Sequence, residues 1–169
     1  MVRVGRTSRS AFYEHFADKE ECFLAAYEQM TAAFIDASLQ AAAGVTGWQA
    51  KLDAGIVTYF RFMAEHPEVA ISTVVEIHSA GRRALEARSR ALRDWMRTIE
   101  GLAVLAQREG VDLPPVEEVA CAAIVLAAEA YVHDYARSGR VKRVGERAAA
   151  VQALARAVRA RRGLTAVDR

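Results

Sequence analysis

Apolar residues recur every three or four positions along most of this chain, which is the period of α-helices that bury one face. The first long stripe lies between Asp18 and about Ala43 and consists of Phe23, Tyr27, Met30 and Phe34. The same period returns from Thr46 to His66, from Arg82 to Arg108, from Pro115 to about Arg137, and around Val144 to Val158. The pattern predicts an all-α protein whose helices share a core.

Capping signals mark several of the expected helix ends. Asp18 with Glu21, and Thr46 with Gln49, have the three-residue spacing of a capping box, in which the two side chains satisfy free N–H groups of the first turn. Gly110 follows the third long stretch and is the expected C-terminal cap of that helix. These signals predict sharply defined helix ends.

A segment of mixed character lies between the second and third long helices. His66-Pro67 ends the second helix, because the residue before a proline is driven out of the helical region. The following segment, Val69 to Ser79, is rich in β-branched residues and would also suit a strand. We interpret it as a short buried helix, because no partner strand is found in the sequence.

The stretch Val119 to Ala128 is apolar on all sides and rich in alanine. A helix without a polar face must be covered all round, which indicates a partner chain. We therefore expect a symmetric homodimer in which this helix and the last one of each subunit form a four-helix interface. The expected interface residues are Ala123, Ile124, Ala127, Tyr131, Val151, Leu154 and Val158. The alternative is a buried central helix of a monomer.

Composition fits one globular domain of 169 residues, with 53% apolar and 26% charged residues. The net charge of +2 is unevenly spread, because residues 137–169 hold ten Lys and Arg against two Asp and Glu. Such a basic end is usually a solvated face, and contact with nucleic acid is the alternative. There is no hydrophobic leader, and the longest apolar run has about half the length of a membrane span, so we expect a soluble, cytoplasmic protein with no membrane contact.

Catalytic motifs are missing from the sequence: it has no Gly-rich phosphate loop, no nucleophile elbow and no pair of His at metal spacing. Glu129 and His133 share a helix face and could pair or bind a metal, although a polar helix edge is the simpler reading. Glu76 and His78 interrupt an apolar segment, and one of them could orient a ligand in a cavity. We expect no enzyme activity, no cofactor and no metal site.

The first residues of the chain have the character of a DNA-reading helix. Thr7 or Ser8 can cap its start, and Phe12 and Phe16 fall on one buried face. The remaining side chains suit base edges and phosphates, and they are Arg9, Ser10, Tyr13 and His15. Lys19 lies in the first turn of the next helix, where its positive charge is unfavourable next to the positive end of the helix dipole. Its presence there indicates a nearby anion such as a DNA phosphate.

Residues 8–23, Ser-Arg-Ser-Ala-Phe-Tyr-Glu-His-Phe-Ala-Asp-Lys-Glu-Glu-Cys-Phe, resemble the end of the helix-turn-helix of the tetracycline-repressor (TetR/AcrR) family. The resemblance implies that Thr7 to Phe16 is the recognition helix, with Tyr13 and Lys19 on phosphates and Arg9 and Ser10 facing bases. It also implies two parts, a DNA-binding head within residues 1–20 and a ligand-binding and dimerisation domain over residues 21–169.

Proteins of this family bind a small, often apolar effector among their central helices, and binding spreads the two DNA-reading heads. Here the resemblance implies a pocket formed by Tyr59, Phe60, Met63, Val74, His78, Trp95, Met96 and Ile99. Without the resemblance, the same aromatic and methionine stripe reads as plain core. The expected effector is small and largely apolar.

The chain departs from the family pattern at its start. In the family, a first helix and the first half of the helix-turn-helix precede the recognition helix, whereas here only Met1 to Arg6 precede it. We therefore expect an incomplete DNA-binding head, and weak or absent binding of duplex operator DNA by this chain. The hypothesis is a dimeric, ligand-responsive transcriptional repressor, and the alternative is a helical ligand-binding or dimerisation protein without a DNA role.

Overall fold

The computed structural model describes residues 9–111 and 118–160, and the side chains within 11–111 and 118–158. These ranges contain the helices α1 (Arg9–His15), α2 (Lys19–Ala43), α3 (Trp48–Glu65), α4 (Pro67–Val74), α5 (Arg82–Arg108), α6 (Glu118–Arg137) and α7 (Ala148–Ala160), with 3₁₀ segments η1 (Glu76–Ser79) and η2 (Val141–Arg147). No strand occurs in the described ranges, so the all-α class is confirmed.

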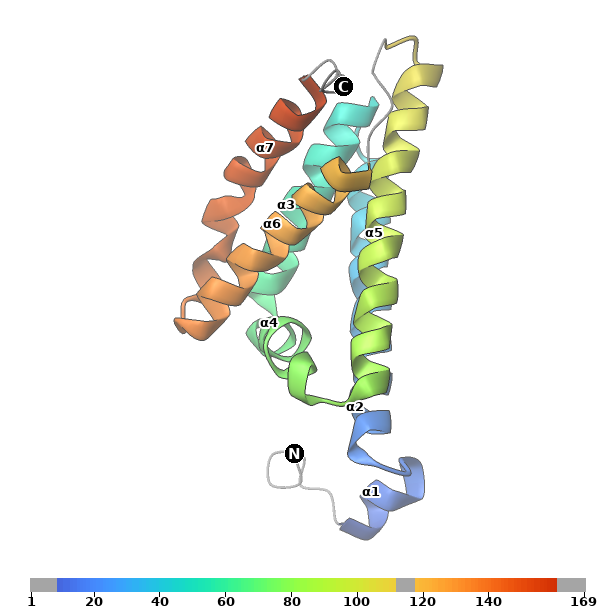
Figure 1. The fold of residues 1–169 in the computed structure, drawn as a ribbon, viewed down its shortest axis with the longest axis vertical. Helices are drawn as coiled ribbons and strands as arrows, with labels where there is room; N and C mark the ends of the chain where they lie inside the picture. The colour runs from blue at the N-terminus through green and yellow to red at the C-terminus, as the bar shows by residue number, and fades with distance from the viewer. Residues whose placement is uncertain (1–8, 112–117, 161–169) are drawn as a thin grey trace, which may run out of the picture.

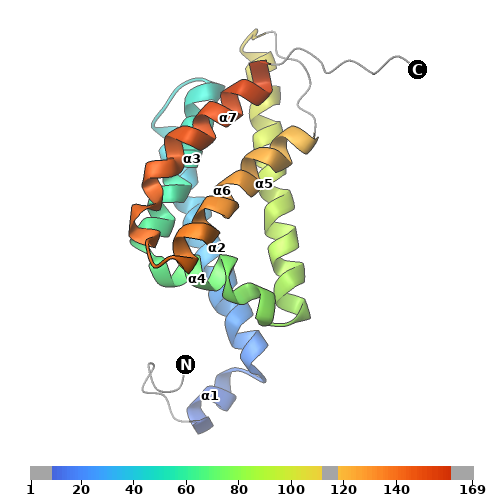
Figure 2. The same cartoon turned by 60° about the vertical axis from the view of Figure 1, so that its left-hand side comes forward.

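Helix α3 is the centre of the body. It packs against α2 and α5 on one side and against α6, α7 and η2 on the other. Figures 1 and 2 show α6 and α7 as an outer pair in front of α3, while α4 crosses one end of the bundle. The largest side chain with no exposure at all, Phe60, lies on α3. Burial on several sides explains why apolar residues surround much of this helix.

Helix α1 stands apart from the body, at the end of α2 (Figure 1). Its rings contact their own neighbours: the centroid of Phe12 lies 5.3 Å from that of Tyr13 and 5.6 Å from that of Phe16. The helix that follows is capped as predicted, because Asp18 Oδ1 accepts the backbone N–H of Glu21 at 2.7 Å. The turn between α1 and α2 is therefore held by local hydrogen bonds.

Two other helix ends follow the predictions from sequence. His66 separates α3 from α4, with Pro67 as the first residue of α4. Gly110 adopts a φ of 79°, and the N–H of Val111 beyond it reaches back to the carbonyl of Ala106 at 3.0 Å. This pair forms the glycine-dependent C-terminal cap expected for α5.

The predicted capping box at Thr46 is wrong. Helix α3 begins after Gly47, which has a φ of 82° and provides no side-chain cap. The N–H of Trp48 is instead accepted by Oε2 of Glu109, at 3.2 Å, from the far end of α5. A residue distant in sequence thus takes over the role that the local pattern assigned to Thr46.

The less regular stretches are helical with breaks. The expected short helix at 69–79 exists as α4 and η1, interrupted at Val75. The expected final helix is divided into η2 and α7, so that Val144 lies in the 3₁₀ segment. Pro115, the predicted start of α6, lies outside the described residues, and the described part of α6 begins at Glu118.

Helix α6 has two apolar faces with different surroundings. Ile124 is 2% exposed and Val151 of α7 is 1% exposed, both within the core of this one chain. Their assignment to a dimer interface is therefore wrong, because both side chains are already buried within this chain, where α6 packs against α3, α4, α5 and α7, and α7 packs against α3 and α6. By length and composition α6 could cross a membrane, but core helices of soluble proteins pass the same test.

Candidate functional site

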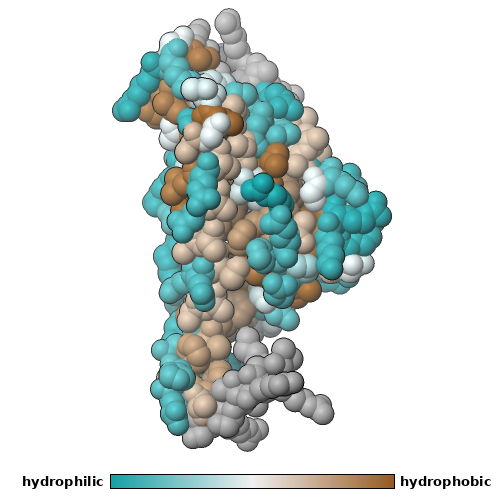
Figure 3. Space-filling view, turned by 180° about the vertical axis from the view of Figure 1, so that it is seen from behind, coloured by the Kyte–Doolittle hydropathy of each residue, from teal (hydrophilic) through white to brown (hydrophobic). Residues whose placement is uncertain are grey.

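A cavity of about 240 Å³ lies between α2, α3, α5 and α6, and we call it the larger cavity. Its wall is mostly apolar, with Leu52, Ile56, Ile99, Leu102, Ile124 and Val125 among the lining residues. Ile35 and Leu39 of α2 also line it and remain 45% and 64% exposed. Figure 3 views the molecule from the α2 side and shows a band of apolar residues along this face. The larger cavity therefore opens to solvent through an apolar rim.

A second cavity of about 40 Å³, the smaller cavity, adjoins the first. Phe34, Tyr59 and Trp95 line both cavities and form a cluster of three rings. The centroid of Trp95 lies 4.7 Å from that of Phe34 and 5.0 Å from that of Tyr59. Tyr59 meets the other two rings edge to face, an arrangement that favours aromatic pairs. This aromatic partition separates the two cavities.

The smaller cavity has a polar end. Glu129 of α6 lines it and forms an ion pair with Arg88 of α5, and the two side chains are 14% and 21% exposed. Burial raises the pKa of Glu129, and the nearby charge of Arg88 opposes that rise. Burial also raises the pKa of Tyr59, well above its ordinary value, and Glu129 adds to the effect. Tyr59 is therefore neutral at physiological pH.

Polar groups in the larger cavity are few and incompletely satisfied. Trp95 Nε1 and Ser38 Oγ are buried and have no hydrogen-bond partner. Lys51 Nζ donates to the carbonyl of Ala42 at 2.7 Å, at the end of α2. The hydroxyl of Thr98, by contrast, donates to the carbonyl of Asp94 at 2.9 Å. The lining residues of the larger cavity thus include many apolar side chains, two residues with a buried, unpaired polar atom and one cation.

Of the predicted pocket residues, five line a cavity, two are packed in the core and one is exposed. Tyr59 and Trp95 line both cavities, Met63 and Val74 line the smaller one, and Ile99 lines the larger one. Phe60 and Met96 pack in the core and line neither of the two cavities. His78 is exposed on η1 and lines neither. The prediction that His78 faces the pocket is wrong, because α4 ends before it and η1 turns its side chain outward.

Sequence reasoning missed most polar residues of this site. These residues come from four different helices: Ser38 and Lys51 line the larger cavity, Glu129 lines the smaller one, and Arg88 pairs with Glu129. One signal was available, because Ser38 lies four residues after Phe34 on the apolar stripe of α2. Pairs such as Arg88 with Glu129 are 41 residues apart and leave no periodic trace in the sequence.

At the α1 end, three predicted DNA contacts are exposed: Tyr13 and His15 on α1, and Lys19 at the start of α2. Thr7 and Ser8 lie outside the described residues, and so do the side chains of Arg9 and Ser10. The exposed groups offer a hydroxyl, an imidazole and an ammonium, all of which can bind phosphate oxygens.

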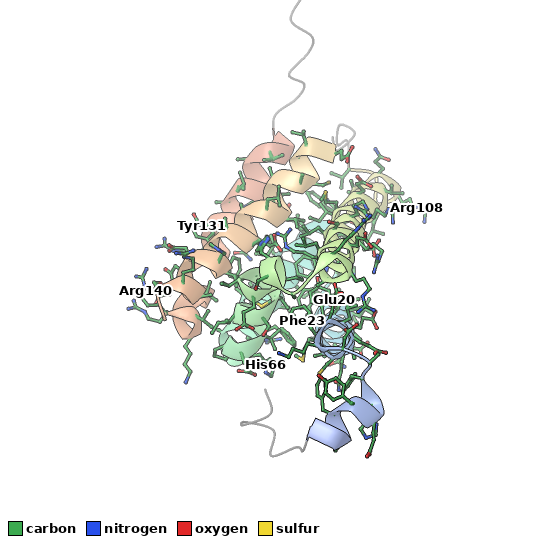
Figure 4. The ribbon with its side chains drawn as sticks, turned by 60° about the horizontal axis from the view of Figure 1, so that its bottom comes forward. Glu20, Phe23, His66, Arg108, Tyr131 and Arg140 are labelled. Carbon is green, nitrogen blue, oxygen red and sulfur yellow. The ribbon has the colours of Figure 1, made fainter. Side chains whose placement is uncertain are left out.

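An ion-pair cluster joins this end to the body. Arg83 at the start of α5 donates from Nε to Glu20 Oε2 at 2.9 Å, and from its terminal nitrogen to Asp18 at 2.8 Å. Glu20 Oε1 accepts the backbone N–H of Arg83 at 2.7 Å, so it also caps α5. The backbone N–H of Glu21, together with Arg83, holds the pKa of Asp18 below its ordinary value, and Arg83 lowers the pKa of Glu20. Glu20 and Phe23 of α2 are labelled in Figure 4.

The outer face of α6 carries a second apolar stripe. Val119, Ala123, Leu126 and Ala130 are exposed at helical spacing, with Val119 75% and Leu126 48% exposed. On the neighbouring α7, Leu154 and Val158 are half-buried. Of the predicted interface residues, Ala123, Ala127, Tyr131, Leu154 and Val158 thus retain some exposure. We call the exposed stripe of α6 together with the half-buried residues of α7 the outer apolar face.

The described residues contain no group of three or more His, Cys, Asp or Glu arranged to hold a metal ion. Glu129 binds Arg88 in this structure, so its carboxylate already has a cationic partner. The chain matches no protein-family model, no curated protein and no solved structure in the three comparisons.

Proposed function

We propose that this chain is a dimeric, ligand-responsive DNA-binding regulator of the tetracycline-repressor type, acting as a repressor. The observation that carries the proposal is the larger cavity, whose wall helices α2 and α5 both run to the α1 end and are joined there by Arg83. A ligand in the cavity contacts the same two helices that hold the head. The exposed Tyr13, His15 and Lys19 supply groups suited to DNA phosphates.

The mechanism that we propose is a population shift. A ligand between α2 and α5 binds best to one relative position of these helices and so favours it over others. In a dimer formed through the outer apolar face, that position sets the separation of the two α1 helices. A helix-turn-helix dimer binds tightly when this separation matches successive major grooves, so ligand binding releases the operator.

A second candidate function is ligand binding or dimerisation without any DNA role. It is favoured by the contacts of Phe12, whose ring partners are Tyr13 and Phe16, both in or next to α1 itself. A helix of 7 residues is marginal without tertiary support, and a loosely held helix reads no fixed sequence. In this case the cavity and the outer apolar face carry the whole function.

A salt-titrated binding assay separates the two candidates. It uses labelled duplexes from around the gene of this protein, with the 169-residue chain and with a form extended by any in-frame codons upstream of Met1. We expect weak, salt-sensitive and unselective binding by the chain, and selective binding by the extended form. Selective, tight binding by the chain itself would refute the expectation of an incomplete head. Unselective binding by both forms would favour the candidate without a DNA role.

A further inference from the structure

Resting on the proposed function, we infer that the larger cavity takes a small aromatic carboxylate, with the ring among its apolar walls and the carboxylate near Lys51 and Ser38. Three observations carry this inference: two buried polar atoms without partners, one cation without a carboxylate partner, and the size of the space. Each of them restricts the chemistry of the ligand in a different way.

The unpaired atoms favour a hydrogen-bonding ligand. A buried polar group without a partner carries a desolvation penalty, so an exception requires an explanation. Thr31 shows the usual solution in the same helix, since its hydroxyl donates to the carbonyl of Tyr27 at 2.8 Å. Ser38 makes no such bond, and neither does the N–H of Trp95. Both groups can donate to an acceptor, and the indole N–H can only donate.

The charge of the cavity favours an anion. None of the described side chains that line the larger cavity is acidic, and Lys51 is its one cation. No described carboxylate lies within ion-pair distance of Lys51. An ammonium group has three donors, and that of Lys51 uses one of them on Ala42. The remaining donors suit a carboxylate.

The polar groups lie in a row along one wall. Phe34, Ser38 and Ala42 are four residues apart on α2, so they share one face of that helix. Trp95 packs against Phe34 at one end of the row, and Lys51 binds Ala42 at the other. Eight residues of helix correspond to about 12 Å. The residues that carry the polar groups are therefore ordered along this wall as Trp95, Ser38 and Lys51.

The size of the cavity favours one or two rings. An engineered cavity of about 150 Å³ holds benzene, and most drug-sized pockets exceed about 300 Å³. The larger cavity, at about 240 Å³, falls between these values. The side chains of Phe34, Tyr59 and Trp95 provide ring faces and edges for an aromatic ligand.

Calorimetric titration with three matched probes tests the inference: naphthalene-2-carboxylate, 2-naphthamide and 2-naphthylmethylamine, at neutral pH. We expect the carboxylate to bind about tenfold more tightly than the amide. A hydrogen bond between charged groups contributes more free energy than a neutral one, and the difference corresponds to about a factor of ten in affinity. The ammonium probe should bind most weakly. Equal affinity for carboxylate and amide, or no binding by any probe, would overturn the inference.

Variants of the lining residues test whether Lys51 binds the carboxylate of the ligand. Lys51→Met should reduce carboxylate affinity to that of the amide, whereas Lys51→Arg should retain the preference. Lys142→Met is the matched control, because Lys142 is exposed and lines neither cavity. Ser38→Ala should weaken both probes severalfold. A carboxylate preference that survives Lys51→Met would place the anion elsewhere and contradict the assignment.

The inference and the proposed function fail in different ways. If the neutral amide binds as well as the carboxylate and still alters DNA binding, the regulator stands and the carboxylate assignment falls. If the carboxylate binds through Lys51 but neither the chain nor its extended form responds on DNA, the assignment stands and the regulator falls. The two experiments therefore judge the two statements separately.

Discussion

Arg83 and Glu20 hold the first turns of α5 and α2 together through two distinct hydrogen bonds. The guanidinium Nε of Arg83 donates to one carboxylate oxygen of Glu20 at 2.9 Å, and the backbone N–H of Arg83 donates to the other at 2.7 Å. A third bond from the N–H of Ala84, at 3.3 Å, uses the same carboxylate. Glu20 is thus both an ion-pair partner and a helix cap for α5.

Arg83→Met should loosen the junction between α2 and α5 while the body stays folded. We expect the amide hydrogens of Arg83 and Ala84 to exchange severalfold faster, because Glu20 loses the guanidinium that orients it. Arg82→Met is the matched control, since Arg82 pairs with Glu86 inside α5. Hydrogen exchange followed by mass spectrometry measures both variants. Equal acceleration in both would show that the Arg83 junction has no special role.

Acid should open the same junction. The pKa of Asp18 is lowered mainly by the N–H of Glu21, and that of Glu20 mainly by Arg83. Carboxylates with lowered folded-state pKa values add stability above their unfolded-state pKa, and this contribution is lost as the pH falls through the lowered values. The acid side of the stability curve should therefore be steeper for wild type than for Glu20→Gln. Denaturant titrations between about pH 2 and 6 measure this difference, and parallel curves would contradict it.

Gly81→Ala should destabilise the protein by about 1 to 3 kcal/mol, the range for a strained backbone position. Gly81 has a φ of 120°, and an added Cβ would clash with Oε1 of Glu20. The control is Gly101→Ala on α5, where nothing lies within 4 Å of the added Cβ. That substitution should stabilise the helix by about 0.5 to 1 kcal/mol. Urea denaturation should give opposite signs for the two variants.

Removal of both partners of the Arg88 and Glu129 pair should cost less than the sum of the two separate removals. Glu129→Gln leaves a largely buried guanidinium without its counter-charge, at a cost of roughly 3 kcal/mol, and Arg88→Met leaves the carboxylate in the same way. The double variant, Arg88→Met with Glu129→Gln, should be less destabilised than the sum of these two single variants. A double-mutant cycle in urea measures the coupling, and additivity would show that the pair is energetically independent.

Leu126→Glu should dissociate the proposed dimer with little effect on the fold of one chain, because Leu126 is exposed on the outer apolar face. Ile124→Glu is the contrasting variant and should unfold the chain, since it introduces a charge into the core. Sedimentation equilibrium gives the mass and circular dichroism gives the helix content. A wild-type chain that stays monomeric at micromolar concentration would remove the basis for the dimer.

Local rules predicted the helices of this protein well and their contacts poorly. The bounds of α2 and α5 follow from periodicity and caps, because the deciding residues, such as Asp18 and Gly110, lie within one turn of the helix end. The cap at Trp48 was missed because its acceptor, Glu109, lies 61 residues away. No periodicity in a single sequence encodes such a partner.

The candidate site shows the same division. Aromatic residues of the pocket could be predicted from the stripes that bury them, as with Tyr59 and Trp95. The outward position of His78 depends on the break in the helix at Val75, which the β-branched sequence did not reveal. The inward position of Ile124 depends on which face of an evenly apolar helix meets α3, and periodicity gives no direction for such a helix.

Because α5 is one uninterrupted helix, a rotation at one point along it displaces its first turn. Trp95 at the cavity and Arg83 at the head junction lie on this one helix, twelve residues apart, which corresponds to about 18 Å along its axis. If α5 pivots at Trp95 by about 5°, its first turn moves by about 1.6 Å, a displacement of the size seen in helix shifts between allosteric states. Hydrogen bonds of 2.7 to 2.9 Å at Glu20 do not survive a relative movement of that size. A small rotation at the aromatic partition would therefore break or re-form the hydrogen bonds between Glu20 and Arg83 next to the head.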